Sequence, residues 1–151
     1  MDCPRISEYK SEHDAELVQM WRAAFEYGVG VKDPHSIKEQ ITYLHEQVLP
    51  TNKLHVAWTG STLAGFVACN SESVTQLRVR VGMHRRGIGS QLLSLAKSES
   101  AGSLWLFTFQ QNQVARAFYE HHGFKAMLFG FEPIWQLADV KYNWQHGHIA
   151  A

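Results

Sequence analysis

The sequence predicts an α/β fold of the α+β kind, with a mixed, mostly antiparallel sheet, a central pair of parallel strands and about four flanking helices. Three observations predict it. Two strand patterns flank a glycine turn at residues 60–61, which is a hairpin signal. A strand pattern at residues 77–81 changes to a helical pattern from residue 88. The apolar run at residues 104–109 follows that helix, so we expect it to pair in parallel with the strand before the helix.

Length and composition predict a single domain over residues 1–151, with a loose tail from about residue 145. Hydrophobic residues make up 45% and charged residues 19%, which is typical of a globular chain. The N-terminus opens no apolar signal region, and no segment approaches the length that spans a membrane. The two cysteines, Cys3 and Cys69, make neither a disulfide framework nor a zinc site. A reducing cytoplasm is the simplest compartment for such a chain.

The first third of the chain predicts an edge strand at residues 5–9 and two helices. The first helix begins near Asp14 and ends at the glycines of residues 28–30. The second begins at a capping box, in which Ser36 is followed three residues later by Glu39, and Pro50 stops it. The large aromatic side chains that we expect in the core of these helices are Trp21, Phe25 and Tyr43, and the alternative is that they contact the substrate.

The later elements follow from changes in period. Residues 54–59 and 62–70 form the hairpin, and a third antiparallel strand ends at Val79. The run at 104–109 is nearly all apolar, as in a strand buried on both faces. A helix follows, ended by Gly123, and residues 124–131 and 139–144 predict the last two strands. The side chains expected on the inner face of that helix are Val114, Ala115, Phe118 and Tyr119.

The strand and helix at residues 77–97 meet at the turn His84-Arg85-Arg86-Gly87-Ile88-Gly89-Ser90. Glycines let a backbone approach a ligand closely, and the unpaired N–H groups of a helix start attract anions. Residues 73–98 hold five basic residues and no acidic one, although the whole chain has a net charge of zero. The alternative is a tight strand–helix turn with a solvated basic face. The turn lacks the Gly-Lys-Ser/Thr of a P-loop and the third glycine of the dinucleotide fingerprint.

The spacing of this turn resembles the acetyl-CoA-binding motif of the GNAT superfamily of N-acetyltransferases. Leu77-Arg78-Val79 and residues 84–89 match that motif in register, except that His84 stands where the family usually has Gln or Arg. That position acts largely through its backbone, so the change does not imply lost function. The run from Asn112 to Phe124 resembles the second well-marked segment of the family.

The resemblance implies acetyl-CoA as co-substrate, no metal, and first helices that wall the acceptor pocket. Asn112 would contact the pantetheine arm, and Tyr119 would be the catalytic residue that protonates the departing thiolate. A free backbone N–H near Val79 would stabilise the oxyanion where the two parallel strands splay apart. The full set expected to bind the co-substrate is Leu77, Arg78, Val79, His84, Arg85, Arg86, Gly87, Ile88, Gly89, Ser90, Asn112, Ala115, Phe118 and Tyr119.

We therefore expect an N-acetyltransferase in which a primary amine attacks the thioester directly through a tetrahedral intermediate. The sequence leaves the general base open among Glu46, Glu72, Glu132 and a water relay. A non-catalytic acyl-CoA-binding or regulatory module on the same fold is the alternative. The histidine pairs at residues 121–122 and at 146 and 148 have no clustered carboxylate or cysteine, so they predict surface histidines rather than a metal site.

The expected partner is a small-molecule or peptide amine, and a homodimer is left open. A sequence pI near 7.1 without a basic stripe argues against nucleic acid, and no membrane partner is expected. The first fifty residues carry an excess of acidic side chains. If they wall the acceptor site, they favour a cationic or amphipathic amine over an acidic one. The alternative is that they are solvated helix faces pointing away from any pocket.

Overall fold

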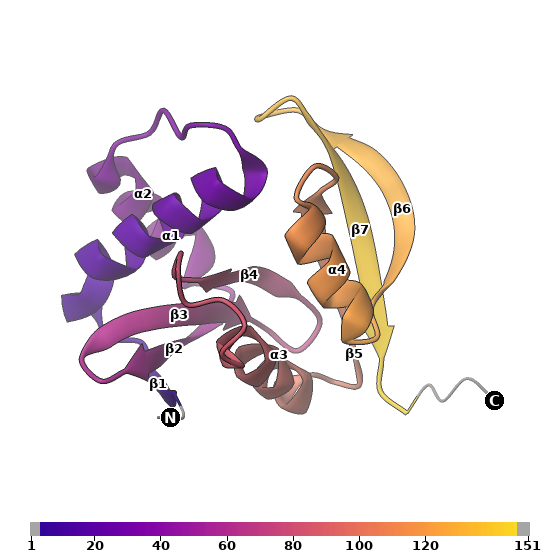
Figure 1. Cartoon of the computed structure of the whole chain (residues 1–151), viewed down its shortest axis with the longest axis horizontal. Coiled ribbons are helices and arrows are strands. Elements are labelled where there is room, and N and C mark those ends of the chain that lie inside the picture. The colour runs from indigo at the N-terminus through magenta and orange to yellow at the C-terminus, as the bar shows by residue number, and fades with distance from the viewer. Residues whose placement is uncertain (1–3, 148–151) are drawn as a thin grey trace.

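The computed structural model describes residues 4–147, which form four α-helices and seven strands (Figure 1). The first half comprises β1 (Arg5–Glu8), a 3-10 turn (Ser11–His13), α1 (Asp14–Val29), α2 (Ile37–Tyr43), a π-helical turn (Leu44–Val48), β2 (Lys53–Thr59), β3 (Thr62–Cys69) and β4 (Val74–Val79). The second half comprises α3 (Ile88–Glu99), β5 (Ser103–Phe109), α4 (Gln113–His121), β6 (Lys125–Glu132) and β7 (Leu137–Gln145). The α/β class expected from the sequence is correct.

The strands form two antiparallel sheets, in the orders β1-β2-β3-β4 and β5-β7-β6. The expected central parallel pair is reduced to a single bridge between Ser73 and Trp105, at the start of β4 and β5. Beyond that bridge β5 pairs with β7 instead, and within residues 4–147 no further pairing joins β5 to β4. The two sheets therefore splay apart from one shared point, as Figure 1 shows between β4 and β5.

Local signals set the ends of the first two helices. Gly30 ends α1 in the left-handed region, with φ of 83°, which glycine adopts without a Cβ penalty. Ser36 caps α2 in the expected capping box: its hydroxyl accepts from the N–H of Glu39, and the Glu39 carboxylate accepts from the N–H of Ser36, both at 3.0 Å. The helical path ends just before Pro50, at Leu49.

Two apolar cores lie on opposite faces of the first sheet. On one face α1 and the π-helical turn pack on β2 and β3, with Leu17, Leu44 and Phe66 fully buried. On the other face α3 fills the angle between the two sheets, and its Leu92 shares a core with Tyr142 of β7. Because α3 connects both sheets through this core, it holds β4 and β5 at the angle at which they splay.

Three expectations about burial are wrong. Tyr43 is 49% exposed, because its ring lies at the surface of a cleft, 6.3 Å from the ring of Trp21 between centroids, rather than within the core. Val114 is 66% exposed, because α4 turns only the stripe of Ala115, Phe118 and Tyr119 inward. Strand β5 is buried on one face only. Its outward side chains are Trp105 and the 54% exposed Phe107, which are covered in part by the Lys141 ammonium over their rings.

Some predicted features fall at the chain ends. Cys3 and residues 148–151 of the expected tail lie outside the described residues, whereas Gln145 belongs to β7. Cys69 is a free, buried thiol in β3. Within residues 4–147, no helix combines the length and the apolar character that crossing a membrane requires. Over the same range, no three His, Cys, Asp or Glu side chains are grouped as metal ligands.

Candidate active site

The splay leaves one backbone edge of β4 open. Antiparallel pairing turns the peptide groups of alternate residues toward the neighbouring strand. The N–H of Arg80 donates to Ala64 of β3 at 2.8 Å, so the peptide groups of Arg78 also face β3. Those of Leu77 and Val79 therefore face the gap toward β5. A backbone edge that has lost its strand partner is a ready acceptor for an extended ligand with amide groups.

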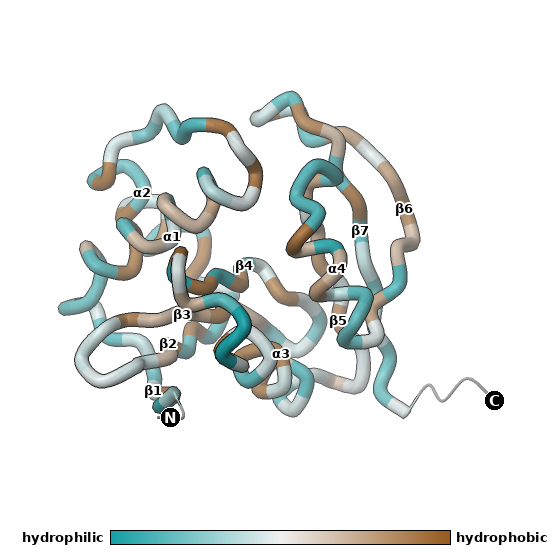
Figure 2. Tube along the Cα trace, viewed as in Figure 1, coloured by the Kyte–Doolittle hydropathy of each residue, from teal (hydrophilic) through white to brown (hydrophobic). Residues whose placement is uncertain are grey.

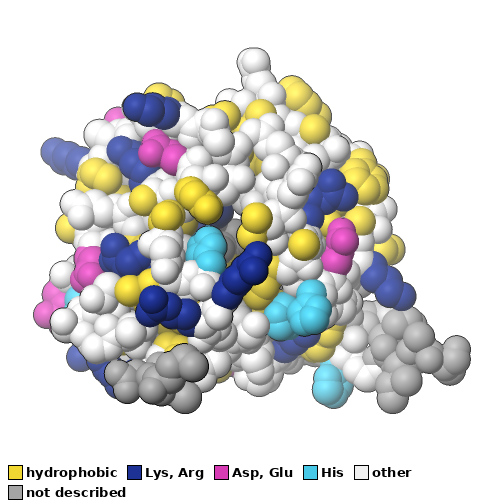
Figure 3. All heavy atoms as spheres, viewed as in Figure 1, with side chains coloured by type: hydrophobic (Ala, Val, Ile, Leu, Met, Phe, Trp, Pro, Cys, Tyr) yellow, Lys and Arg dark blue, Asp and Glu magenta, His cyan; other side chains and the backbone are white. Residues whose placement is uncertain are grey.

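The loop that enters α3 carries the exposed basic side chains Arg85 and Arg86. Gly87 is the N-cap of α3 with φ of 81°, and no side chain caps the helix start. Figure 3 shows Lys, Arg and His side chains gathered below the middle of the viewed face, over this loop and the end of α4. His84 contacts the carbonyl of Val79 through its ring at 3.3 Å. The free N–H groups and the positive charges make this end of α3 suitable for phosphate.

Gly89 has a packing role that the motif alone does not indicate. A Cβ at this position would lie 3.2 Å from Cζ of Phe118 on α4. The absence of a side chain therefore lets α3 and α4 approach each other beside the open edge of β4. Next to it, the Ser90 hydroxyl lies 3.1 Å from Nε2 of His122, which also links the two helices. Ile88, the remaining motif residue, is buried in the core between the sheets.

Asn112 is buried and its side chain serves α4 itself. Its amide oxygen accepts from the N–H of Ala115 at 3.2 Å, which caps the helix. Its amide nitrogen faces α1, where a Cβ on Gly28 would come within 2.8 Å. Gly28 thus makes room for the start of α4, a role that its position at the end of α1 does not reveal.

Tyr119 is the buried tyrosine on the inner face of α4, with its ring among Phe118, Phe124 and Tyr142. Within residues 4–147, its hydroxyl has no hydrogen-bond partner. Burial raises the pKa of Tyr119 to about 12, and the positive charge of Arg78 acts in the opposite direction. The phenol is therefore protonated at neutral pH and free to donate to a ligand.

A cleft of about 480 Å³ opens between the two halves of the molecule. One wall comes from α1 and α2, and the floor comes from β4 and the end of β5. The opposite wall consists of α4 and the loop between β6 and β7. Aromatic side chains from both walls and the floor of the cleft contact one another. The ring centroid of Phe25 lies 4.8 Å from that of Trp135 and 6.3 Å from that of Phe109. Trp21 and Phe25 are thus both core and cleft wall.

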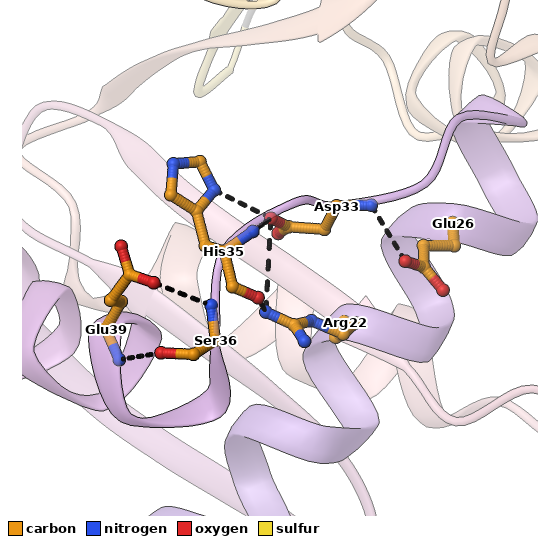
Figure 4. Close-up of polar contacts among 6 residues, drawn as sticks. All are labelled: Arg22, Glu26, Asp33, His35, Ser36 and Glu39. Carbon is orange, nitrogen blue, oxygen red and sulfur yellow. Dashed lines mark hydrogen bonds and ion pairs between the residues drawn. The ribbon is translucent and has the colours of Figure 1, made fainter.

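The α1–α2 loop at the mouth of the cleft is held by a polar network (Figure 4). Asp33 accepts from the ring of His35 at 2.7 Å and pairs with Arg22 at 3.9 Å. Its N–H donates to Glu26 of α1 at 2.8 Å, and Arg22 also donates to the carbonyl of His35. The ring of His35 lies 5.9 Å from that of Trp135, so the network fixes the mouth against the opposite wall.

Comparison with protein families decides the assignment. The model of the acetyltransferase (GNAT) family matches residues 15–124, which is more than half of the chain. The chain belongs to this family. It is therefore an acyltransferase, and the turn before α3 and the segment from Asn112 to Phe124 lie inside the matched region. A comparison with curated protein sequences finds no match.

Solved structures of GNAT proteins share the fold over nearly the whole chain. Apo YjaB from Escherichia coli is 19% identical with a TM-score of 0.78, covering 97% of this chain and 100% of that one. The PaiA N-acetyltransferase from Thermoplasma acidophilum, in complex with coenzyme A, is 18% identical with a TM-score of 0.75 over 96% and 100%. YncA from Salmonella typhimurium, with acetyl-CoA, is 13% identical with a TM-score of 0.74 over 99% and 98%. At these identities the likeness establishes the fold.

The GNAT motif residues divide into two groups in space. Five of them line the cleft, namely Leu77, Arg78, Asn112, Ala115 and Tyr119, whereas none of residues 84–90 does. Among the carboxylates expected as a general base, only Glu132 lines the cleft. Sequence reasoning missed the network of Arg22, Asp33 and His35 and the contribution of Trp135, because no local pattern marks them. The assignment of Arg78 to the co-substrate stays a prediction, and the structure places its side chain in the cleft.

Proposed function

We propose that the chain is an acetyl-CoA-dependent N-acetyltransferase, in which a primary amine attacks the thioester directly through a tetrahedral intermediate. The observation that carries the proposal is the open edge of β4, which runs from the uncapped start of α3 to the cleft at Tyr119. PaiA with coenzyme A and YncA with acetyl-CoA support this co-substrate.

The residues present fit acetyl-CoA at two places. The exposed Arg85 and Arg86 and the free N–H groups at the start of α3 suit its pyrophosphate. The backbone edge of Leu77 and Val79 suits the amides of its pantetheine arm, by strand-like hydrogen bonds. The amide nitrogen of Asn112 is the group of that side chain left to reach the arm, because its oxygen caps α4.

Three groups of the chain would assist the transfer. The N–H of Val79 would stabilise the oxyanion, an effect worth roughly 2.7–4 kcal/mol for one donor. Tyr119 would donate a hydrogen bond to the thiolate. Full proton transfer from a phenol of pKa about 12 to a thiolate, whose acid has a pKa near 8.5, is uphill by roughly 5 kcal/mol, so a hydrogen bond within the site is the favoured role. Glu132 would take the proton of the amine, directly or through water.

A non-catalytic acyl-CoA-binding module is the alternative. The unpartnered hydroxyl of Tyr119 favours the enzyme, because a tyrosine retained only for packing has no need of it. The deciding experiment measures free-thiol release from acetyl-CoA across a panel of amines. Amine-dependent release supports the enzyme. Tight acetyl-CoA binding without release by any amine supports the module.

Binding at the turn is tested with two matched glycine variants. Gly87 and Gly60 both have positive φ, 81° and 60°, and a Cβ at either meets no atom within 4 Å. Gly87→Val and Gly60→Val therefore impose similar backbone strain, but only the first places a side chain at the proposed pyrophosphate site. We expect Gly87→Val to weaken acetyl-CoA binding strongly in calorimetry and Gly60→Val to leave it unchanged. Equal affinity of both folded variants would refute this placement.

We also propose a homodimer through β6, the edge strand of its sheet. Four of its large apolar side chains are more than half exposed, namely Met127, Leu128, Phe129 and Phe131. Figure 2 colours much of β6 as hydrophobic, and Figure 3 shows hydrophobic side chains at that edge. A second copy supplies an equally long and equally apolar edge, so two-fold pairing of β6 with itself would complete both backbones. A cytoplasmic location stays a prediction from the cysteine content.

A further inference from the structure

Arg78 is the cation on the floor of the cleft. Its side chain leaves β4 on the face opposite to Leu77 and Val79 and is only partly exposed. Its Nε and Nη2 both donate to the single amide oxygen of Gln76, at 3.2 and 3.0 Å. Its Cζ lies 5.7 Å from the ring centroid of Phe25, so an aromatic face covers one side of the guanidinium.

This guanidinium has no carboxylate partner: within residues 4–147, no Asp or Glu oxygen lies within 4.0 Å of Arg78. Its neighbour along the strand differs, since Arg80 pairs with Glu16 at 3.5 Å and donates to the carbonyl of Leu63 at 2.7 Å. Burial of a cation without an anion is costly, and the neutral oxygen of Gln76 together with an aromatic ring offsets that cost only in part. Burial accordingly lowers the pKa of Arg78, although an arginine stays charged.

The cleft's own carboxylates, Asp33, Glu39, Glu132 and Asp139, do not supply the missing anion, because none of them lies within 4.0 Å of Arg78. Asp33 is engaged by His35 and Arg22. Glu39 is held by the N-terminus of α2, and Glu132 accepts from the N–H groups of the two residues after Pro133. These acidic side chains lie on the walls of the cleft, whereas the guanidinium of Arg78 lies on its floor.

We propose that the acceptor amine carries a carboxylate that binds Arg78, so that the substrate is a short amino acid rather than a purely cationic amine. This inference rests on the proposed function. With Nε and Nη2 committed to Gln76, the Nη1 side of the guanidinium is the part left for a ligand, and a planar carboxylate matches it. Arg78 and Tyr119 line the same cleft of about 480 Å³, and this volume limits the separation of a carboxylate at Arg78 from an amine that reacts beside Tyr119. A carboxylate at Arg78 therefore lies close to the reacting amine, which requires a short spacer between them.

The charge pattern agrees with a zwitterion. Carboxylates on the walls attract the ammonium form of the amine, and the cationic floor attracts its carboxylate. Among residues 4–50, two acidic side chains line the cleft, those of Asp33 and Glu39. The acidic wall expected from the sequence is thus thin, and a cationic acceptor loses most of its support. The turn of residues 84–90, which is the proposed phosphate site, contributes no residue to this cleft. Arg78 lies in the cleft instead, so its charge is left for the acceptor rather than for the phosphates of the co-substrate.

The test compares the binding of ligands that carry no free amine. A carboxylate next to an amine changes the pKa of that amine, so free amines would differ in charge as well as in the carboxylate. N-acetylglycine, N-acetylleucine and N-acetylphenylalanine, the products of the proposed reaction, are each measured against the corresponding carboxamide. Binding is followed by calorimetry with coenzyme A present, and turnover of the parent amino acids by thiol release. We expect at least one acid to bind about 10-fold more tightly than its amide or better, as for a hydrogen-bonded charge pair.

The preference must depend on Arg78. Arg78→Gln should abolish it, and Arg80→Gln, which removes the same charge outside the cleft, should retain it. If Arg78→Gln does not fold, Arg78→Met keeps the aliphatic stem over Phe25 and serves instead. Equal binding of acids and amides, or a preference that survives loss of Arg78, overturns the inference. If acids bind in an Arg78-dependent way but no amine causes thiol release, the carboxylate site is supported and the proposed acetyltransferase function is contradicted. If amines cause thiol release but acids and amides bind equally, the proposed function is supported and the carboxylate site is contradicted.

Discussion

Removal of one hydroxyl at Tyr119 should separate catalysis from stability. Tyr119→Phe keeps the ring packing against Phe118, Phe124 and Tyr142. The hydroxyl has no partner within residues 4–147, so its loss breaks no hydrogen bond of the fold. If it donates to the thiolate, its loss costs about 1.5–3 kcal/mol, which corresponds to a roughly 10- to 150-fold lower kcat. The melting temperature should stay unchanged or rise slightly.

Tyr142 is the matched control, because it is a buried tyrosine of the same core that lies outside the cleft. Its hydroxyl donates to Glu120 at 2.6 Å and accepts from Arg116 at 3.1 Å. Tyr142→Phe loses both bonds, which should cost about 1–2 kcal/mol and lower the melting temperature by roughly 2–8 °C. Its kcat should be close to that of the wild type.

Steady-state thiol release gives kcat for the two variants, and thermal denaturation followed by circular dichroism gives their melting temperatures. Calorimetry with acetyl-CoA should give nearly equal affinities for Tyr119→Phe and the wild type, because the effect belongs to the transition state. A kcat for Tyr119→Phe within a factor of about two of the wild type would refute the donor role. So would a large fall in its melting temperature, which would make Tyr119 a structural residue.

Three further predictions follow from single features. Gly65→Ala should destabilise the fold by about 1–3 kcal/mol, since its Cβ would lie 2.8 Å from the carbonyl oxygen of Arg78. Gly130→Ala is the control and should destabilise the fold less, because its Cβ would meet only an aspartate side-chain oxygen, at 3.0 Å. Similar urea midpoints for the two variants would contradict this prediction. The pKa of Tyr119 is raised from 10, its value in the unfolded chain, to about 12 in the fold, so its contribution to stability is complete below pH 10 and is lost as the pH rises from 10 to about 12. Tyr119→Phe should therefore make the free energy of unfolding depend less on pH in that range. Leu128→Lys should convert the proposed dimer to a monomer in light scattering, and a wild type that is monomeric at high concentration would exclude the β6 interface.

The sequence predicted the elements well because their signals are local. Alternation and helical spacing depend on neighbours along the chain, and so do the capping box at Ser36 and the turn at Gly60. The motif of residues 84–89 likewise indicated a glycine turn at a helix start, which is where Gly87 caps α3. The family resemblance followed from the same local spacing and is confirmed by the family match over residues 15–124.

Only the tertiary structure decided how those elements combine into a cleft. The apolar run of β5 looks the same in sequence whether one or two of its faces are buried, and its pairing with β7 left Phe107 exposed. The side chain of Arg78 alternates with Leu77 and Val79, yet the closing of α1 and α2 over its face of β4 is what turned it into a cleft residue. A sequence alone determines the periodicity of each element and the chemistry of each side chain. Which faces meet depends on packing between segments far apart in the chain, and that packing placed the guanidinium of Arg78 in the cleft that Tyr119 also lines.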